Sequence, residues 1–226
     1  MRLDALFATA ERELKLSELP LPVDIDALVA GGRVADRPWE VELGIGKGRF
    51  LVERAAACRE RRFLGVEVAS KYYRMARERV RRRGLDNVLL VRGEALYLLC
   101  AVLPAAFAAA VHVYFPDPWP KSRHHKRRLF DPETADLVLG LLRPGGDLFF
   151  ATDFLDYGET VAEILAGFPR LRLERVDGLW PEGARTNYEA KYVAEGRPIL
   201  RLHGVLEAGV PLHPAGRCGI LVAPRP

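Results

Sequence analysis

Strand-like and helix-like segments alternate along most of this chain, and the alternation restricts the possible folds more than any other feature of the sequence. Short turns separate the segments, so successive strands are expected to pair in parallel through right-handed crossovers. The pattern predicts an α/β fold with an open, doubly wound, mostly parallel sheet that carries helices on both faces. The predicted strands are WEVEL (39–43), RFLGVEV (62–68), NVLLVRG (87–93), AAAVHVYF (108–115) and DLFFAT (147–152).

Local capping signals predict where the helices begin and end. The glycine turn at 44–48 opens a helix after the first strand, and Ser70 is the expected N-cap of a helix that runs through Arg83. Asp131 followed by proline is typical of a helix start. The segment LRPGG (142–146) is expected to end that helix with a turn before the next strand.

The composition fits a single domain of ordinary size. Of 226 residues, 49% are hydrophobic and 28% are charged, which is the balance of a soluble globular protein. We expect a short N-terminal segment (1–38), one domain (39–206) and a C-terminal extension (207–226) that matches no known pattern. The N-terminus lacks a secretory pattern, and no apolar run reaches the roughly 20 residues that span a bilayer, so we expect a cytoplasmic protein without a membrane span.

The spacing of cysteines and histidines argues against a metal site or a disulfide framework. Cys58, Cys100 and Cys218 are scattered without a CxxC pair, which indicates small buried side chains in a reducing compartment. His124 and His125 are adjacent and would diverge on a helix or a strand, so they are not expected to share a metal. No metal is therefore predicted.

Every predicted strand ends at residues suited to ligand binding. In an open α/β sheet, ligands bind at the carboxyl ends of the strands. In chain order these ends carry Gly44, Gly46 and Gly48, then Glu67, Glu94, Asp117 and Asp153. The coincidence predicts a single site along this edge of the sheet.

The first strand end indicates the kind of cofactor. In VELGIGKGRF (41–50), Arg49 stands where the dinucleotide fingerprint has its third glycine, so NAD fits poorly. Glu42 would repel a pyrophosphate but suits the cationic amino-acid end of S-adenosylmethionine. Glu67 has the position of a carboxylate that accepts ribose hydroxyl protons, a contact that both cofactors use. In the alternative interpretation the glycines only allow helix packing, which leaves Glu42 as a costly unpaired carboxylate on a buried strand.

Positive charge is concentrated in two segments. The arginines of YYRMARERVRRRG (72–84) could neutralise phosphates, but a solvated helix face is the favoured interpretation of this segment. The loop FPDPWPKSRHHKRRLF (115–130) instead holds Asp117 between two prolines beside a run of cations that can neutralise phosphates. Trp119 in this loop is expected to anchor it to the body of the protein.

The loop FPDPWPKSRHHKRR resembles the signature loop of the bacterial tRNA (guanine-N7)-methyltransferase family, and RTNYEAK (185–191) resembles that family's Thr-x-Tyr/Phe-Glu motif. Together with VELGIGKG and FLGVEV, the resemblance covers most of the chain from about Trp39 to Leu206. It implies a Rossmann-like class I methyltransferase fold, S-adenosylmethionine as methyl donor and tRNA as substrate. The implied reaction is methylation at N7 of guanine-46 in the tRNA variable loop, by a monomer or a homodimer.

The resemblance also implies roles for individual residues. Asp117 is the implied catalytic residue, beside both the methyl donor and the base. Guanine N7 has a free lone pair, so a carboxylate there would act by alignment and by offsetting the positive charge that the purine gains. The cofactor-binding residues are Glu42, Gly44, Gly46, Glu67, Glu94 and Asp117. The substrate-binding residues are Lys121, His124, Arg127, Asp153, Thr186, Asn187, Tyr188 and Glu189.

Plainer interpretations stay open for several of these residues. Thr186 and Glu189 have the spacing of a capping box, and Asp153 suits the N-cap of the helix that follows it. Glu94 contacts the adenine either with its side chain or through its backbone. For the whole chain, one alternative is a methyltransferase acting on another RNA position or on a small basic molecule. The other is a non-catalytic RNA-binding protein on the same scaffold.

Overall fold

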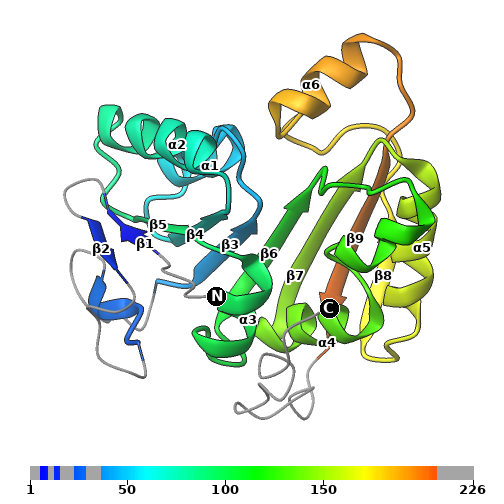
Figure 1. The fold of residues 1–226 in the computed structure, drawn as a ribbon, viewed down its shortest axis with the longest axis horizontal. Coiled ribbons are helices and arrows are strands. Elements are labelled where there is room, and N and C mark those ends of the chain that lie inside the picture. The colour runs from blue at the N-terminus through cyan, green and yellow to red at the C-terminus, as the bar shows by residue number, and fades with distance from the viewer. Residues whose placement is uncertain (1–5, 10–12, 16–22, 29–36, 208–226) are drawn as a thin grey trace.

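A single sheet forms the centre of the computed structural model, which describes residues 6–9, 13–15, 23–28 and 37–207. The sheet has nine strands in the order β2-β1-β5-β4-β3-β6-β7-β9-β8 (Figure 1). Most of the predicted N-terminal segment and nearly all of the C-terminal extension, with Cys218, lie outside the described residues. The strands are β1 (Leu6–Ala8), β2 (Glu13–Lys15), β3 (Trp39–Leu43), β4 (Arg62–Glu67), β5 (Val88–Arg92), β6 (Ala108–Tyr114), β7 (Leu142–Thr152), β8 (Leu171–Arg175) and β9 (Leu200–Leu206).

The five central strands confirm the predicted parallel sheet. β5, β4, β3, β6 and β7 all pair in parallel, while β9 runs antiparallel to both β7 and β8. From β3 the chain winds outward through β4 to β5 and then returns to add β6 and β7 on the other side. The direction of winding therefore switches between β3 and β6, which is where ligands bind in folds of this kind.

Helices cover both faces of the sheet. α1 and α2 share one apolar cluster with β4 and β5, whereas α3, α4 and α5 pack into a second cluster on the opposite face. α6 stands beyond the edge at which the parallel strands end (Figure 1). None of the helices in the described residues is long and apolar enough to cross a membrane. The helices are α1 (Arg49–Ala57), α2 (Ser70–Arg82), α3 (Ala95–Ala101), α4 (Pro132–Leu141), α5 (Leu155–Ala166) and α6 (Asn187–Ala194).

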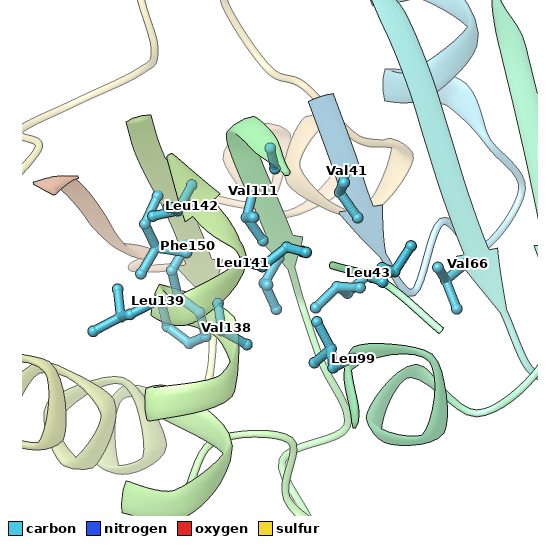
Figure 2. Packing of buried hydrophobic residues seen from close by; sticks show 14 of the residues in the cluster. Val41, Leu43, Val66, Leu99, Val111, Val138, Leu139, Leu141, Leu142 and Phe150 are labelled. Atoms are coloured by element: carbon cyan, nitrogen blue, oxygen red, sulfur yellow. The ribbon is translucent and has the colours of Figure 1, made fainter. Parts of the chain in front are cut away.

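The larger core holds the switch point in place. Val41 of β3, Val111 of β6 and Phe150 of β7 are fully buried and belong to one cluster with Val138 and Leu139 of α4 (Figure 2). Full burial of each such side chain contributes about 1.5–3 kcal/mol relative to exposure. The strand ends at the switch point are therefore carried by a rigid layer.

Local signals predicted one helix start correctly and another incorrectly. Asp131 caps α4, because its side chain accepts a hydrogen bond from the backbone N–H of Thr134 in a capping box. Ser70 is not the N-cap of α2: Ala69 takes that position without a side-chain hydrogen bond, and Ser70 is the first helical residue. The helix ends at Arg82, one residue before the predicted end.

The segment LRPGG is not a separate turn, as the sequence predicted, but the beginning of β7. Leu142 already pairs with Ala108 of β6, and the register then shifts before Ala110 pairs with Asp147. Pairing with β6 thus keeps this segment in the sheet despite its proline and glycines. Cys58 and Cys100 are half-buried, and so less buried than predicted.

Candidate active site

The three glycines after β3 have different tasks. All three have positive φ, at 81° for Gly44, 51° for Gly46 and 70° for Gly48, a region that glycine enters without steric cost. A Cβ on Gly48 would lie 2.7 Å from the Cβ of Ala76 on α2, so this glycine allows close packing of the two helices. A Cβ on Gly44 or Gly46 would meet nothing within 4 Å. The packing interpretation therefore accounts for Gly48 but leaves the first two glycines facing open space.

Glu67 ties the end of β4 to this glycine turn. Its Oε2 accepts a hydrogen bond from the backbone N–H of Gly46 at 2.8 Å, and its Oε1 accepts one from Ala69 at 2.8 Å. Each carboxylate oxygen keeps a further lone pair for a ligand. The contact holds the turn and the strand end at a constant separation.

Glu42 is a buried carboxylate with an unsatisfied oxygen. Its side chain is on β3 and only 2% of the residue is exposed, and no described residue donates a hydrogen bond to Oε2. Burial raises the pKa of Glu42 to about 8; a backbone hydrogen bond from Leu51 opposes the rise, and the charge of Glu67 adds to it. A cationic ligand group would satisfy this oxygen and stabilise the ionised form. The site thus fits the ammonium group of S-adenosylmethionine.

The loop after β6 holds Asp117 on a strained backbone. Phe115 and Trp119 have φ of 51° and 40°, which non-glycine residues rarely adopt, and each costs of order 1–3 kcal/mol. The Phe115 N–H binds the carbonyl of Ala151 on β7 at 2.7 Å. Between these two residues Asp117 is exposed. The strained backbone on both sides thus restricts the conformation of the segment that carries Asp117.

The ring contacts of Trp119 lie within its own loop, whereas the sequence predicted an anchor to the body of the protein. His124 meets the Trp119 ring edge-on at 5.7 Å, and the Arg127 guanidinium lies 4.9 Å from the ring centre. Lys121 is exposed just before the 3₁₀ helix Ser122–Arg127. Arg128 is turned towards the protein instead, where its Nε donates to the Pro118 carbonyl at 2.9 Å.

The start of α6 is held by buried side chains. Thr186 is the N-cap, with its hydroxyl accepting from the Glu189 N–H at 3.0 Å. Glu189 is fully buried, and its carboxylate accepts from the Arg185 N–H and from Arg201 Nε, both at 2.7 Å. The predicted capping box is therefore incomplete, because Glu189 binds the N–H before the N-cap rather than that of Thr186. The structure does not expose Glu189 beside Asp117.

An aromatic cluster brings α6 to the Asp117 loop. The ring of Tyr188 lies 6.3 Å from that of Phe115 and 6.1 Å from that of Tyr192. Burial raises the pKa of Tyr188, and the neighbouring Tyr72, Tyr192 and Asp117 add to the rise. Tyr188 is still 52% exposed. The four-residue spacing of Tyr188 and Tyr192 on α6 is the sequence signal that could have predicted this cluster.

Arg185 was also missed, although it fastens the segment before α6. Its Nη1 donates to the Tyr114 hydroxyl at 2.6 Å. Its guanidinium lies 4.2 Å from the ring centre of Trp180 and 4.4 Å from that of Phe149. Only the tertiary structure brings these aromatic side chains together around one arginine.

The remaining predicted residues lie at the margin of the site. Glu94 occupies the N-cap position of α3, is exposed and makes no capping hydrogen bond. Asp153 is not the N-cap of α5, which is Phe154; its carboxylate instead binds Arg197 at 3.3 Å. Asn187 is exposed at the first position of α6. Within the described residues there is no group of three His, Cys, Asp or Glu side chains that could hold a metal.

Comparison with known proteins adds a family match and relatives. The model of a family described as "Putative methyltransferase" matches residues 36–202. A tRNA (guanine-N(7)-)-methyltransferase of Nitrosococcus oceani is 39% identical over 165 residues, which cover 72% of this chain and 69% of that protein. One of Geobacter metallireducens is 35% identical over 202 residues, covering 84% of this chain and 90% of that protein.

Solved structures show the same fold. The 16S rRNA methyltransferase KamB superimposes with a TM-score of 0.62 at 16% identity, covering 90% of this chain and 100% of that one. This similarity confirms the predicted class I methyltransferase fold.

Proposed function

Because the chain belongs to the family of tRNA (guanine-N(7)-)-methyltransferases, we propose that it transfers a methyl group from S-adenosylmethionine to N7 of guanine-46 in the variable loop of tRNA. The observation that supports this most is the meeting of two unlike sites at the β3–β6 switch point. Glu42 and the open glycine turn follow β3, and the exposed Asp117 with its basic loop follows β6. We place this reaction in the cytoplasm, on a monomer or homodimer.

The glycine turn and two glutamates form the cofactor site in this proposal. Glu42 pairs with the ammonium group, which supplies the missing partner of its Oε2. Glu67 accepts the ribose hydroxyls with its remaining lone pairs, while Gly44 and Gly46 leave room for the ligand. Glu94 lies on the adenine side. When bound, S-adenosylmethionine supplies an electrophilic methyl group on its sulfonium.

Asp117 supports the transfer electrostatically. Guanine N7 needs no deprotonation before it attacks, so the protein does not have to supply a strong base. The purine gains positive charge as the methyl group arrives, and a carboxylate directed at it offsets that charge. Because the strained residues on either side and the flanking prolines restrict the loop, Asp117 has little reorganisation left to make.

The substrate-binding residues divide into a phosphate side and a guanine side. The RNA backbone is bound by the basic loop, through Lys121, His124 and Arg127. On the guanine side, Tyr188 offers an exposed ring beside Asp117. Glu189 acts from the interior by holding the start of α6. The guanine-side residues are Asp153, Thr186, Asn187, Tyr188 and Glu189.

The test uses methyl transfer from labelled S-adenosylmethionine to an unmodified tRNA transcript. Wild-type protein is expected to label the transcript at N7, but not a transcript with adenine in place of guanine-46. Asp117→Ala should lower turnover about 100-fold or more and leave the affinities for tRNA and cofactor nearly unchanged. The control is Asp177→Ala, which removes an exposed carboxylate from another loop.

Each outcome separates the alternatives. Full turnover by Asp117→Ala would remove the role assigned to that residue. Equal labelling of both transcripts would keep the methyltransferase and move its target. Binding of cofactor and tRNA without any labelling would favour the RNA-binding protein.

A further inference from the structure

A pocket of about 380 Å³ lies between α1, the C-terminal turns of α2 and the start of α6. None of the residues of the basic loop 115–130 lines it. The sequence marked the arginines of α2 as able to neutralise phosphates but favoured a solvated helix face for them. The polar residues that line the pocket are Arg49, Glu53, Arg79, Arg82, Arg83 and Asn187.

The pocket holds more positive charge than its carboxylate can balance. Glu53 is engaged by Arg49, with 3.3 Å between Nε and Oε1. Arg82 pairs with a glutamate that does not line the pocket. Arg79 and Arg83 form no ion pair with any residue of the described chain. Four guanidinium groups therefore gather around one glutamate, an arrangement that an anion would stabilise.

Helix ends of both signs border the pocket. The arginines at the C-terminal end of α2 complement the dipole of their own helix, so a solvated face would explain them. Arg49 is at the opposite kind of position, as the first residue of α1, where the dipole disfavours a cation. Its Nη1 lies 3.5 Å from the Thr186 carbonyl, next to the start of α6. The positive ends of α1 and α6 thus meet the arginine-covered C-terminal end of α2 at the pocket.

We propose that this pocket binds a phosphate of the tRNA backbone and forms a second contact for the substrate besides the basic loop. The inference rests on the proposed function, because it takes tRNA as the substrate. Guanidinium groups bind phosphate oxygens through paired N–H donors. Asn187 lines the pocket, while the ring of its neighbour Tyr188 lies 6.3 Å from that of Phe115 in the Asp117 loop. One RNA strand can therefore reach both places across the start of α6.

The experiment measures tRNA affinity and turnover for Arg79→Gln/Arg83→Gln. These substitutions remove two charges that no ion pair uses, and glutamine keeps the first part of the aliphatic stem and the helix propensity of arginine. The dissociation constant and the KM for tRNA should rise roughly tenfold, with kcat at saturating tRNA within about twofold of wild type. The slope of log Kd against log salt should fall by about 1, because one phosphate contact is lost. Binding of S-adenosylmethionine and the melting temperature should not change.

The matched control is Lys71→Gln/Arg74→Gln, which removes two exposed charges from the same helix outside the pocket. If both double variants lose affinity equally, or if neither does, the pocket is not a phosphate site. If the pocket variant fails to fold, Arg83→Glu at the exposed end of α2 takes its place and should weaken tRNA binding. Because affinity is measured without turnover, a wild-type protein that binds tRNA but methylates nothing would refute the proposed function and not the pocket.

Discussion

Without bound cofactor, the buried charge of ionised Glu42 lowers the free energy of unfolding, and replacing Glu42 by glutamine removes that charge. Burial raises the pKa of Glu42 from 4.5 to about 8. The native state therefore binds this proton more tightly than the unfolded chain does. By linkage, the carboxyl group lowers the free energy of unfolding progressively as pH rises from about 4.5 to about 8. Glu42→Gln is neutral at every pH and should lack this loss.

The two pKa values determine the size of the effect. With 4.5 for the unfolded chain and about 8 for the folded protein, linkage gives a loss of about 3 kcal/mol between about pH 5.5 and about pH 8.5. Other titrating groups contribute equally to both proteins and cancel in the difference. The variant should thus gain about 3 kcal/mol over wild type across this interval.

Urea denaturation of both proteins without cofactor, at several pH values in this range, measures the difference. Stability curves that run parallel for wild type and Glu42→Gln would refute the reasoning, because Glu42 would then titrate as an exposed carboxyl does. The same denaturation experiment with saturating S-adenosylmethionine gives a second measurement. If its ammonium group pairs with ionised Glu42, saturating cofactor should stabilise wild type more strongly at high pH and stabilise the variant far less.

Two further substitutions test the contacts around the site. Arg201→Met should lower the free energy of unfolding by about 3–5 kcal/mol, because it leaves the Glu189 carboxylate buried without its cation. The double variant Arg201→Met/Glu189→Gln should recover part of this loss, whereas a loss below about 1 kcal/mol in the single variant would contradict the role of the ion pair. Gly48→Ala should lower the free energy of unfolding by about 2–4 kcal/mol in a thermal or urea melt, because the new methyl group clashes with Ala76 and alanine also resists the positive φ. Gly44→Ala should lose only the part that comes from the positive φ. Equal losses at the two glycines would argue against the packing explanation.

The sequence by itself determined the layered fold and the edge on which the site lies. The segment WEVEL predicts a strand because Trp39, Val41 and Leu43 recur at every second position, a pattern that depends only on neighbouring residues, and β3 is indeed buried throughout. The Asp131 cap could be predicted for the same reason, since its hydrogen bonds reach only three residues along the chain. Glu42 could be singled out because a carboxylate on a buried strand has few ways to be satisfied.

Tertiary structure decided what each polar residue near the site contacts. Glu189 reads as an exposed substrate or capping residue in RTNYEAK, yet Arg201 and the Arg185 N–H hold it in the interior. Arg185 finds its hydroxyl partner on Tyr114, 71 residues away. The arginines of α2 look like a solvated face until Arg49 and the start of α6 close a pocket around them. Burial, charge balance and pKa depend on segments that are distant in the chain, and no local pattern carries that information.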